Sequence, residues 1–269
     1  MKYKLIAIDM DDTLLPSGLS ISARTKEAIK AAEDKGVKVL IATGRMFSSA
    51  LPHLKEMGLH GEVITYNGAL VKEIDSANTI LHKPVDLVSA HKIIDIVKKE
   101  DLHLNIYLDD ILYVNKLGAE ADYYEQISGI KPVLIKDDLN DFLESPSTKL
   151  LIVEEDIEKA DAIEESLEKE FGDILNITRS KPKFIEIINK EVSKGNTLAQ
   201  IVEDLGLSSE EVIAVGDSFN DLEMIEYAGL GVAVANAREK IKERADYITK
   251  SNDEDGVAEL IEKFILAEE

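Results

Sequence analysis

The chain has 269 residues, 45% of them hydrophobic, which suits one large globular domain or two smaller ones. Its 53 acidic and 31 basic residues give a formal charge of −22, which argues against nucleic acid or an anionic membrane as the main partner. The absence of cysteine excludes disulfides and thiol nucleophiles, and no apolar run reaches the roughly 18 residues of a membrane span. The apolar segment after residues 1–4 is too short for a signal peptide, so we expect a cytoplasmic protein.

The first third of the chain alternates short apolar runs with helical patterns. Apolar runs at 5–8, 37–41 and 63–65 predict strands, and the patterns near 22–35 and 47–57 predict helices between them. This alternation predicts βαβ units, in which right-handed crossovers connect the strands of a parallel sheet.

The same alternation returns at the end of the chain. Strands are expected at 212–215 and 231–234, and helices at 194–205, 221–227 and 255–265. The two ends together therefore predict an α/β fold with one doubly wound, mainly parallel sheet, a Rossmann-like core.

The middle of the chain has a different pattern. The runs 104–108 and 111–114 flank Asp109-Asp110 as a hairpin would, and three further strands are expected at 150–153, 174–178 and 184–188. This pattern predicts an inserted α+β domain. Proline and polar residues interrupt the patterns near both of its ends, so we expect the core to be 1–82 and 191–269 and the insertion to be 83–190.

Acidic residues follow the first predicted strand directly. In an extended strand Asp9 and Asp11 would point the same way and place two carboxylates at the carboxyl end of the sheet, where open α/β sheets bind ligands. A hard cation such as Mg²⁺ would relieve their repulsion. The alternative is a turn that caps the following segment.

Two further motifs could bind an anion. Thr43-Gly44 follows the second predicted strand, where a hydroxyl and backbone N–H groups can hold a phosphate, although a simple cap and turn fits equally well. Lys194 opens a predicted helix, where a cation opposes the helix dipole, and the helix-breaking Gly195 follows it. Such violations of local rules favour a functional residue, here a phosphate ligand, over a solvated surface lysine.

The segment after the strand 212–215 carries a fourth motif. Asp217 would lie at the end of this strand and Asp221 one helical turn later, so both carboxylates could approach one cation, with Asn220 between them. Capping by Asp217 or Ser218 is the alternative, but capping does not require the second acid.

Several other features are interpreted as structural. Arg45 could support the second motif or pair with an acid, Asn67-Gly68 reads as a turn, and Phe184 is expected to pack the insertion. The five histidines show no metal-ligand spacing. The acidic runs 154–156 and 252–255 are interpreted as solvated loops or helix starts.

These four motifs in this order resemble the haloacid dehalogenase (HAD) phosphohydrolases, and more closely their Cof-type branch. Asp9–Thr13, Thr43, Lys194 and Gly216–Asp221 match the four motifs, and Asn67-Gly68-Ala69 is a further Cof-type feature. The resemblance covers essentially the whole chain, with the insertion at the place of a class II cap. Asp12 and Ala235 depart from the pattern, because many relatives carry Gly there.

The resemblance implies an Mg²⁺-dependent phosphatase acting on small phosphomonoesters such as sugar phosphates. It implies that Asp9 forms an aspartyl-phosphate and that Asp11 is the general acid and base. Thr43, Gly44, Lys194 and Asn220 would bind the phosphate. The implied metal ligands are Asp9, Asp11 through its carbonyl, Asp217 and Asp221, with Asn220 in support.

Rival functions share parts of this machinery. A phosphomutase would use the same aspartyl-phosphate, and a phosphoacceptor signalling domain also clusters Asp, Thr and Lys, but in another order and without an insertion. A catalytically silent binding protein is disfavoured by the complete residue set. The expected partner is a small phosphorylated metabolite, with no nucleic acid or membrane, and the expected state is a monomer or small homo-oligomer.

Overall fold

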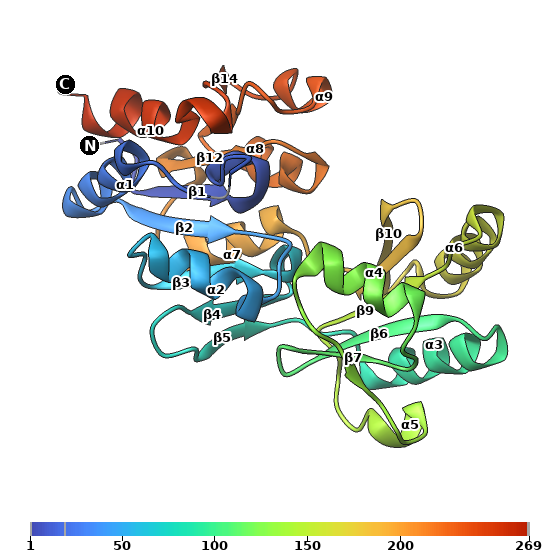
Figure 1. Ribbon diagram of the computed structural model, residues 1–269. Helices are drawn as coiled ribbons and strands as arrows, with labels where there is room; N and C mark the ends of the chain where they lie inside the picture. Colours follow the sequence, from blue (N-terminus) through green and yellow to red (C-terminus); the bar gives the residue numbers. More distant parts are fainter. Residues whose placement is uncertain (1, 19, 268–269) are drawn as a thin grey trace. The chain divides into compact units, whose positions relative to one another are not determined.

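The computed structural model describes residues 2–18 and 20–267, which form two compact units (Figure 1). We call the unit formed by 1–45, 50–80 and 193–269 the core, and the unit formed by 46–49 and 81–192 the insertion. Residues 46–49 group with the insertion, although the sequence pattern predicts them in the core.

The core contains one eight-stranded sheet. In sheet order its strands are β14 (Tyr247–Ile248), β13 (Leu230–Ala233), β12 (Val212–Gly216), β1 (Leu5–Asp9), β2 (Lys38–Ala42), β3 (Glu62–Thr65), β4 (Leu70–Glu73) and β5 (Thr79–His82). The first six run parallel and β4 pairs antiparallel with β3. Strand β1 is fully buried because helices cover both faces of the sheet. The predicted α/β fold class is therefore confirmed.

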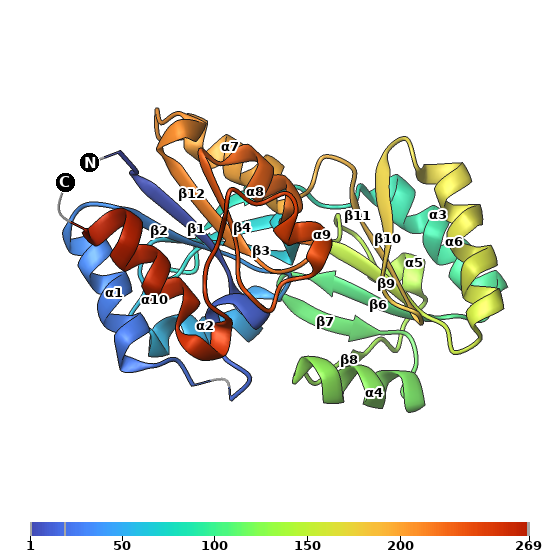
Figure 2. The same ribbon diagram turned by 90° about the horizontal axis from the view of Figure 1, so that it is seen from above.

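Helices cover both faces of this sheet. Those of the core are α1 (Ala23–Asp34), α7 (Lys194–Asp204), α8 (Leu222–Tyr227), α9 (Glu239–Lys242), α10 (Gly256–Ile261) and, from residue 50 onward, α2 (Phe47–Glu56). Figure 2 shows α1 and α10 packed together on one face and α7 and α8 on the other. The side chain of Ser22 accepts a hydrogen bond from the Thr25 N–H, so it caps α1 where the sequence predicts a helix start.

The insertion contains a second, mostly antiparallel sheet. Its strands, in sheet order, are β10 (Leu175–Lys181), β11 (Phe184–Asn189), β9 (Lys149–Val153), β6 (His103–Leu108), β7 (Ile111–Val114) and β8 (Val133–Leu134). Asp109 and Asp110 both adopt left-handed φ angles, 52° and 61°, in the turn between β6 and β7. The predicted hairpin is confirmed, because two left-handed residues match the twist of its strands.

Helices also cover the sheet of the insertion. They are α3 (Leu87–Lys99), α4 (Ala119–Ser128), α5 (Leu139–Phe142) and α6 (Ile157–Phe171). Apolar residues of α3 and α6 form one buried cluster with alternate residues of the strands. The other face includes Phe184, which is 3% exposed and lies 5.7 Å from the ring of Tyr124 on α4. Phe184 therefore packs the insertion, as expected.

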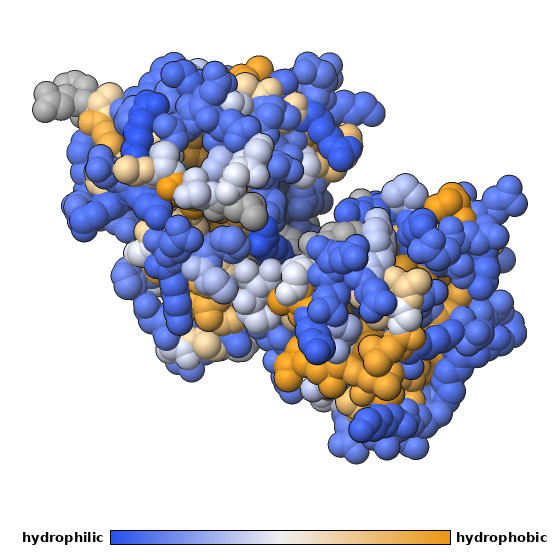
Figure 3. Space-filling view, viewed as in Figure 1, coloured by the Kyte–Doolittle hydropathy of each residue, from blue (hydrophilic) through white to orange (hydrophobic). Residues whose placement is uncertain are grey.

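Figure 3 shows hydrophilic side chains over most of the visible surface of the core, in keeping with the charge of −22. Within residues 2–18 and 20–267, we find no helix that combines the length and the apolar character needed to cross a membrane.

Candidate active site

The site lies at the carboxyl ends of the central core strands. Asp9 is the last residue of β1 and is 5% exposed, because β1 is flanked by β2 and β12 in the middle of the sheet. After Asp9 the chain makes a tight turn, Met10–Leu14, in which Asp11 is extended and Asp12 is left-handed. Parallel strands place their following loops at one edge, so the motifs after β1, β2 and β12 come together here.

Lys194 links two of these carboxylates. Its Nζ donates to Oδ1 of Asp9 at 2.5 Å and to Oδ1 of Asp221 at 2.7 Å. The side chain is fully buried, so the interpretation as a solvated surface lysine is wrong. Burial by itself would lower the pKa of Lys194, but the two carboxylates outweigh it and raise this pKa. The ammonium group is therefore held in its charged form.

A close approach of two helices brings Lys194 into the site. A Cβ on Gly195 would lie 2.5 Å from Cβ of Glu223 on α8, so only glycine allows α7 to pack this tightly. Ser193 caps α7 and accepts a hydrogen bond from the Asn196 N–H at 3.0 Å. Gly195 is thus required for the close packing of α7 against α8, and this packing positions the preceding residue, Lys194, in the site.

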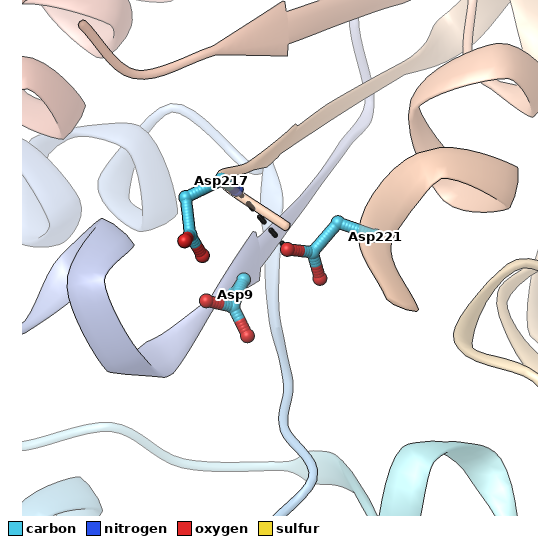
Figure 4. Close-up of side chains that lie close together, drawn as sticks. All are labelled: Asp9, Asp217 and Asp221. Atoms are coloured by element: carbon cyan, nitrogen blue, oxygen red, sulfur yellow. Dashed lines mark hydrogen bonds between the residues drawn. The ribbon is translucent and has the colours of Figure 1, made fainter. Parts of the chain in front are cut away.

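Asp217 and Asp221 come from the segment after β12, and Figure 4 shows their carboxylates close to that of Asp9. One carboxylate oxygen from each of the three acids lies within 4.8 Å of the others. Oδ2 of Asp221 accepts from the N–H groups of Asp217 and Ser218 at 3.1 and 3.0 Å. Asp221 therefore holds both this loop and Lys194 in place.

The acids of the site fit a divalent cation. Burial, Asp221 and Asp12 together raise the pKa of Asp217 to about 6, and burial and Asp221 raise that of Asp9. Burial is the largest cause of both shifts, and repulsion between the neighbouring carboxylates adds to it. Carboxylate oxygens are the ligands that Mg²⁺ prefers, so the converging carboxylates suit this ion. Among residues 2–18 and 20–267, these three acids form the single acidic or histidine cluster of metal-binding geometry.

Arg45 pairs with Asp11, which resolves the two readings of this residue. Its Nε donates to Oδ2 of Asp11 at 2.8 Å, and one terminal NH₂ group donates to Oδ1 at 2.5 Å. The hydrogen bond to Asp11 raises the pKa of Arg45. A two-pronged pair of this kind fixes the direction of a carboxylate as well as its charge. Asp11 is thus aimed by a residue next to the second motif.

Thr43 follows β2 and is fully buried. Its N–H donates to the carbonyl of Ile64, and its Oγ1 accepts from the N–H of Arg45 at 3.1 Å. Because the N–H groups of Thr43 and Arg45 already donate within the protein, they are not the backbone groups that would bind an anion in this loop. The Thr43 hydroxyl group and the Gly44 N–H remain as the predicted phosphate donors of this motif.

Asn67 belongs to the same edge, although the pattern Asn67-Gly68 by itself predicts only a turn. Its N–H donates to the carbonyl of Thr43, and its Oδ1 accepts from Nδ2 of Asn220 at 3.0 Å. A Cβ on Gly44 would lie 2.9 Å from this Oδ1, so glycine lets Asn67 approach. Asn67 does adopt a turn conformation, with φ 57°, and also ties the second motif to the fourth.

Two more asparagines, for which the sequence pattern predicts no role, lie beside the motif loops. Asn236 and Asn252 both donate to carbonyl oxygens of the segment after β1. Asp253 and Asp255 also accept hydrogen bonds, from Ser17 and Ser22. The interpretation of 252–255 as a solvated loop is therefore incomplete, because a local charge pattern does not reveal which distant segment a loop contacts.

A sequence model of the haloacid dehalogenase-like hydrolase family matches residues 6–261. The chain belongs to this family. The match includes the insertion and all four motifs, so the predicted resemblance is confirmed, and a hydrolase is favoured over a phosphoacceptor signalling domain.

Relatives of this HAD-like hydrolase carry phosphatase names. It is 33% identical to the putative phosphatase YxeH of Bacillus subtilis, with 98% of this chain and 99% of that protein covered. It is 36% identical to YcsE of the same organism, a 5-amino-6-(5-phospho-D-ribitylamino)uracil phosphatase, with 98% and 96% covered. The crystal structure of TM0651 from Thermotoga maritima superposes with a TM-score of 0.89 at 33% identity, with 97% of each chain covered. The predicted enzyme class, a HAD-type phosphatase, is confirmed.

Proposed function

We propose that this HAD-like hydrolase releases phosphate from small phosphomonoesters in an Mg²⁺-dependent reaction that passes through an aspartyl-phosphate on Asp9. The observation that carries the proposal is the buried ammonium group of Lys194 between Asp9 and Asp221, beside a third carboxylate, Asp217. A cation enclosed by acids is the arrangement needed to bring a phosphate dianion next to a carboxylate nucleophile.

Asp9 supplies the nucleophile. Its carboxylate attacks phosphorus in line, so that a new P–O bond forms as the bond to the leaving alcohol breaks. Asp11 gives its proton to the leaving oxygen and afterwards takes a proton from the water that attacks the aspartyl-phosphate. This second step releases inorganic phosphate and regenerates Asp9. The pairing with Arg45 fixes the direction of the Asp11 carboxylate, and one Asp11 oxygen has to leave this pair to carry the proton.

Lys194 and Thr43 bind oxygens of the transferred phosphoryl group, with Gly44 and Asn220 at the edge of the site. Asp9, Asp217 and the backbone carbonyl of Asp11 would hold Mg²⁺, which when bound neutralises charge on the phosphoryl oxygens. Asp221 acts by holding Lys194 and the Asp217 loop, since its oxygens already accept three hydrogen bonds.

Charge balance supports this assignment. Around Lys194, the three carboxylates of Asp9, Asp217 and Asp221 outnumber the single ammonium group by two, because Arg45 is paired with Asp11. A phosphate dianion would meet a site of its own sign unless a divalent cation were bound, so we expect activity to depend on the metal.

We further propose that the insertion selects the substrate and that the substrates are sugar phosphates or similar metabolites. The name of YcsE describes a phosphate ester of a ribityl chain, and a phosphorylated sugar alcohol belongs to the same chemical class. Sugar phosphates and ribitol 5-phosphate are therefore the first compounds to screen.

The test is phosphate release from 4-nitrophenyl phosphate and from a panel of metabolite phosphates, with Mg²⁺ and with EDTA. We expect equal amounts of alcohol and inorganic phosphate with Mg²⁺, and loss of activity with EDTA. An isomeric sugar phosphate without free phosphate would instead indicate a mutase. Full turnover by purified Asp9→Asn would contradict the nucleophile assignment.

A further inference from the structure

The turn after β1 has an unusual backbone. Asp11 is extended, with φ −80° and ψ 135°, whereas Asp12 is left-handed, with φ 56° and ψ 6°. The N–H of Leu15 closes the turn on the carbonyl of Met10 at 2.8 Å. Residues other than glycine rarely adopt left-handed angles, although Asp and Asn tolerate them best. Because the Asp11–Asp12 peptide lies between these two conformations, small changes at Asp12 would redirect the Asp11 side chain.

Two asparagines from the last part of the chain hold this turn. Nδ2 of Asn236 donates to the carbonyl of Asp12 at 2.6 Å, and Nδ2 of Asn252 donates to that of Leu15 at 3.0 Å. The backbone N–H of Asn252 donates to Oδ1 of Asn236 at 3.0 Å, which joins the two. The turn is therefore held at its middle residue, Asp12, and just after its end, at Leu15, by one connected pair, which we call the asparagine clamp.

The clamp needs amides in particular. The Asn236 side chain donates from Nδ2 and accepts at Oδ1 at the same time, which a carboxylate cannot do because it only accepts. An aspartate at 236 would also add negative charge near Asp12. Asn252 is 9% exposed, so its amide has little water to bond with in place of Leu15.

The clamp also joins the first motif to the fourth. The segment that carries Asn236 runs beside the end of β12, where Val234 N–H donates to the carbonyl of Gly216 and Arg238 N–H to that of Asp217. Thr13 on the turn donates to Oδ1 of Asp217 at 3.3 Å. Asn236 thus reaches the Asp12 carbonyl from a segment that is itself fixed to the Asp217 loop.

We infer that Asn236 and Asn252 are positioning residues that fix the Asp12–Thr13 peptide and so, through the backbone of Asp12, aim the neighbouring Asp11 at the leaving-group oxygen. This inference rests on the proposed function, in which Asp11 is the general acid. Arg45 holds the Asp11 carboxylate, and the clamp holds the backbone carbonyl of the next residue, Asp12. Neither asparagine touches the substrate; both act through Asp11.

The test compares two substrates that need the acid to different extents. The 4-nitrophenolate ion leaves without a proton because it is weakly basic, whereas the alkoxide of an alkyl phosphate such as ribitol 5-phosphate needs one. The value of kcat/KM reports phosphoryl transfer in both cases. Asn236→Asp and Asn236→Ala are the variants to use, because residue 236 is exposed and both should fold.

We expect the ratio of kcat/KM for the alkyl substrate to that for the aryl substrate to fall about tenfold or more in both variants, since small misplacements of a catalytic group are costly. Asp11→Asn should lower the same ratio. Asn78→Asp is the matched control, because it makes the same charge change in the exposed turn between β4 and β5, and it should leave the ratio unchanged.

The measured rates distinguish a failure of the positioning role from a failure of the proposed phosphatase function. An unchanged ratio in both Asn236 variants, or an equal loss for the two substrates, would overturn the positioning role and leave the phosphatase proposal standing. A wild-type protein that cleaves neither these esters nor the metabolite panel would refute the proposed function itself.

Discussion

Replacing Lys194 by methionine tests the central ion pairs of the site. Methionine keeps the length of the side chain and removes the charge that bridges Asp9 and Asp221 at 2.5 and 2.7 Å. Removing one partner of a buried ion pair costs about 3–5 kcal/mol, because the other charge is left buried and unpaired. Lys194→Met leaves two such carboxylates, so we expect a loss of stability at the upper end of this range at neutral pH.

This loss should depend on pH with a definite sign. Lys194 opposes the rise in the pKa of buried Asp9, so without Lys194 this pKa rises further, and a protonated acid is no longer an unpaired buried charge. The difference in unfolding free energy between wild type and Lys194→Met should therefore be smaller at pH 5 than at pH 8. Urea unfolding at both pH values, in EDTA, measures it.

Activity should fall more than stability explains. Removing a preorganised charged group that faces the transferred phosphoryl costs about 10²–10³ in rate, so kcat/KM should drop by that factor even where the variant is fully folded. Lys149→Met is the matched control, because Lys149 is also buried and pairs with Glu186 at 2.9 Å on the sheet of the insertion. The control should lose stability and keep activity on 4-nitrophenyl phosphate. A folded Lys194→Met that retains kcat/KM within threefold of wild type would refute the reasoning.

Three further predictions concern the acids and Arg45. Asp9→Asn should lower kcat about 10⁴-fold or more and leave the fold intact, as measured by phosphate release and circular dichroism, because it removes the nucleophile. Since the raised pKa of Asp217 is about 6, protons should compete with Mg²⁺ below that pH, and the gain in Tm on adding Mg²⁺ should be large at pH 7.5 and small at pH 5. A gain independent of pH would argue against Asp217 as a ligand. Arg45→Lys should lower kcat about tenfold because a lysine cannot pair with both oxygens of Asp11, and an unaltered pH–rate profile would contradict this link.

The local sequence determined the core strands and the position of most motifs. Short apolar runs closed by Asp9, Thr43 and Asp217 predicted parallel strands that deliver polar residues to one edge of a sheet, and the structure has β1, β2 and β12 at those places. This worked because the alternation of strand and helix, and the direction of parallel strands, follow from hydrophobic periodicity and chain connectivity. The helix-breaking Gly195 likewise pointed to Lys194 before any contact was known.

Only the tertiary structure decided which of these residues touch one another. The pairing of Arg45 with Asp11, the bridge of Lys194 between two acids and the bonds from the asparagine clamp to the turn join residues 27 to 237 positions apart in the chain. Nothing in the neighbourhood of Asn236 or Asn252 in the sequence marks the carbonyl that each one meets. Such contacts arise when the sheet brings separate loops to one edge, so their geometry exists only in the folded chain.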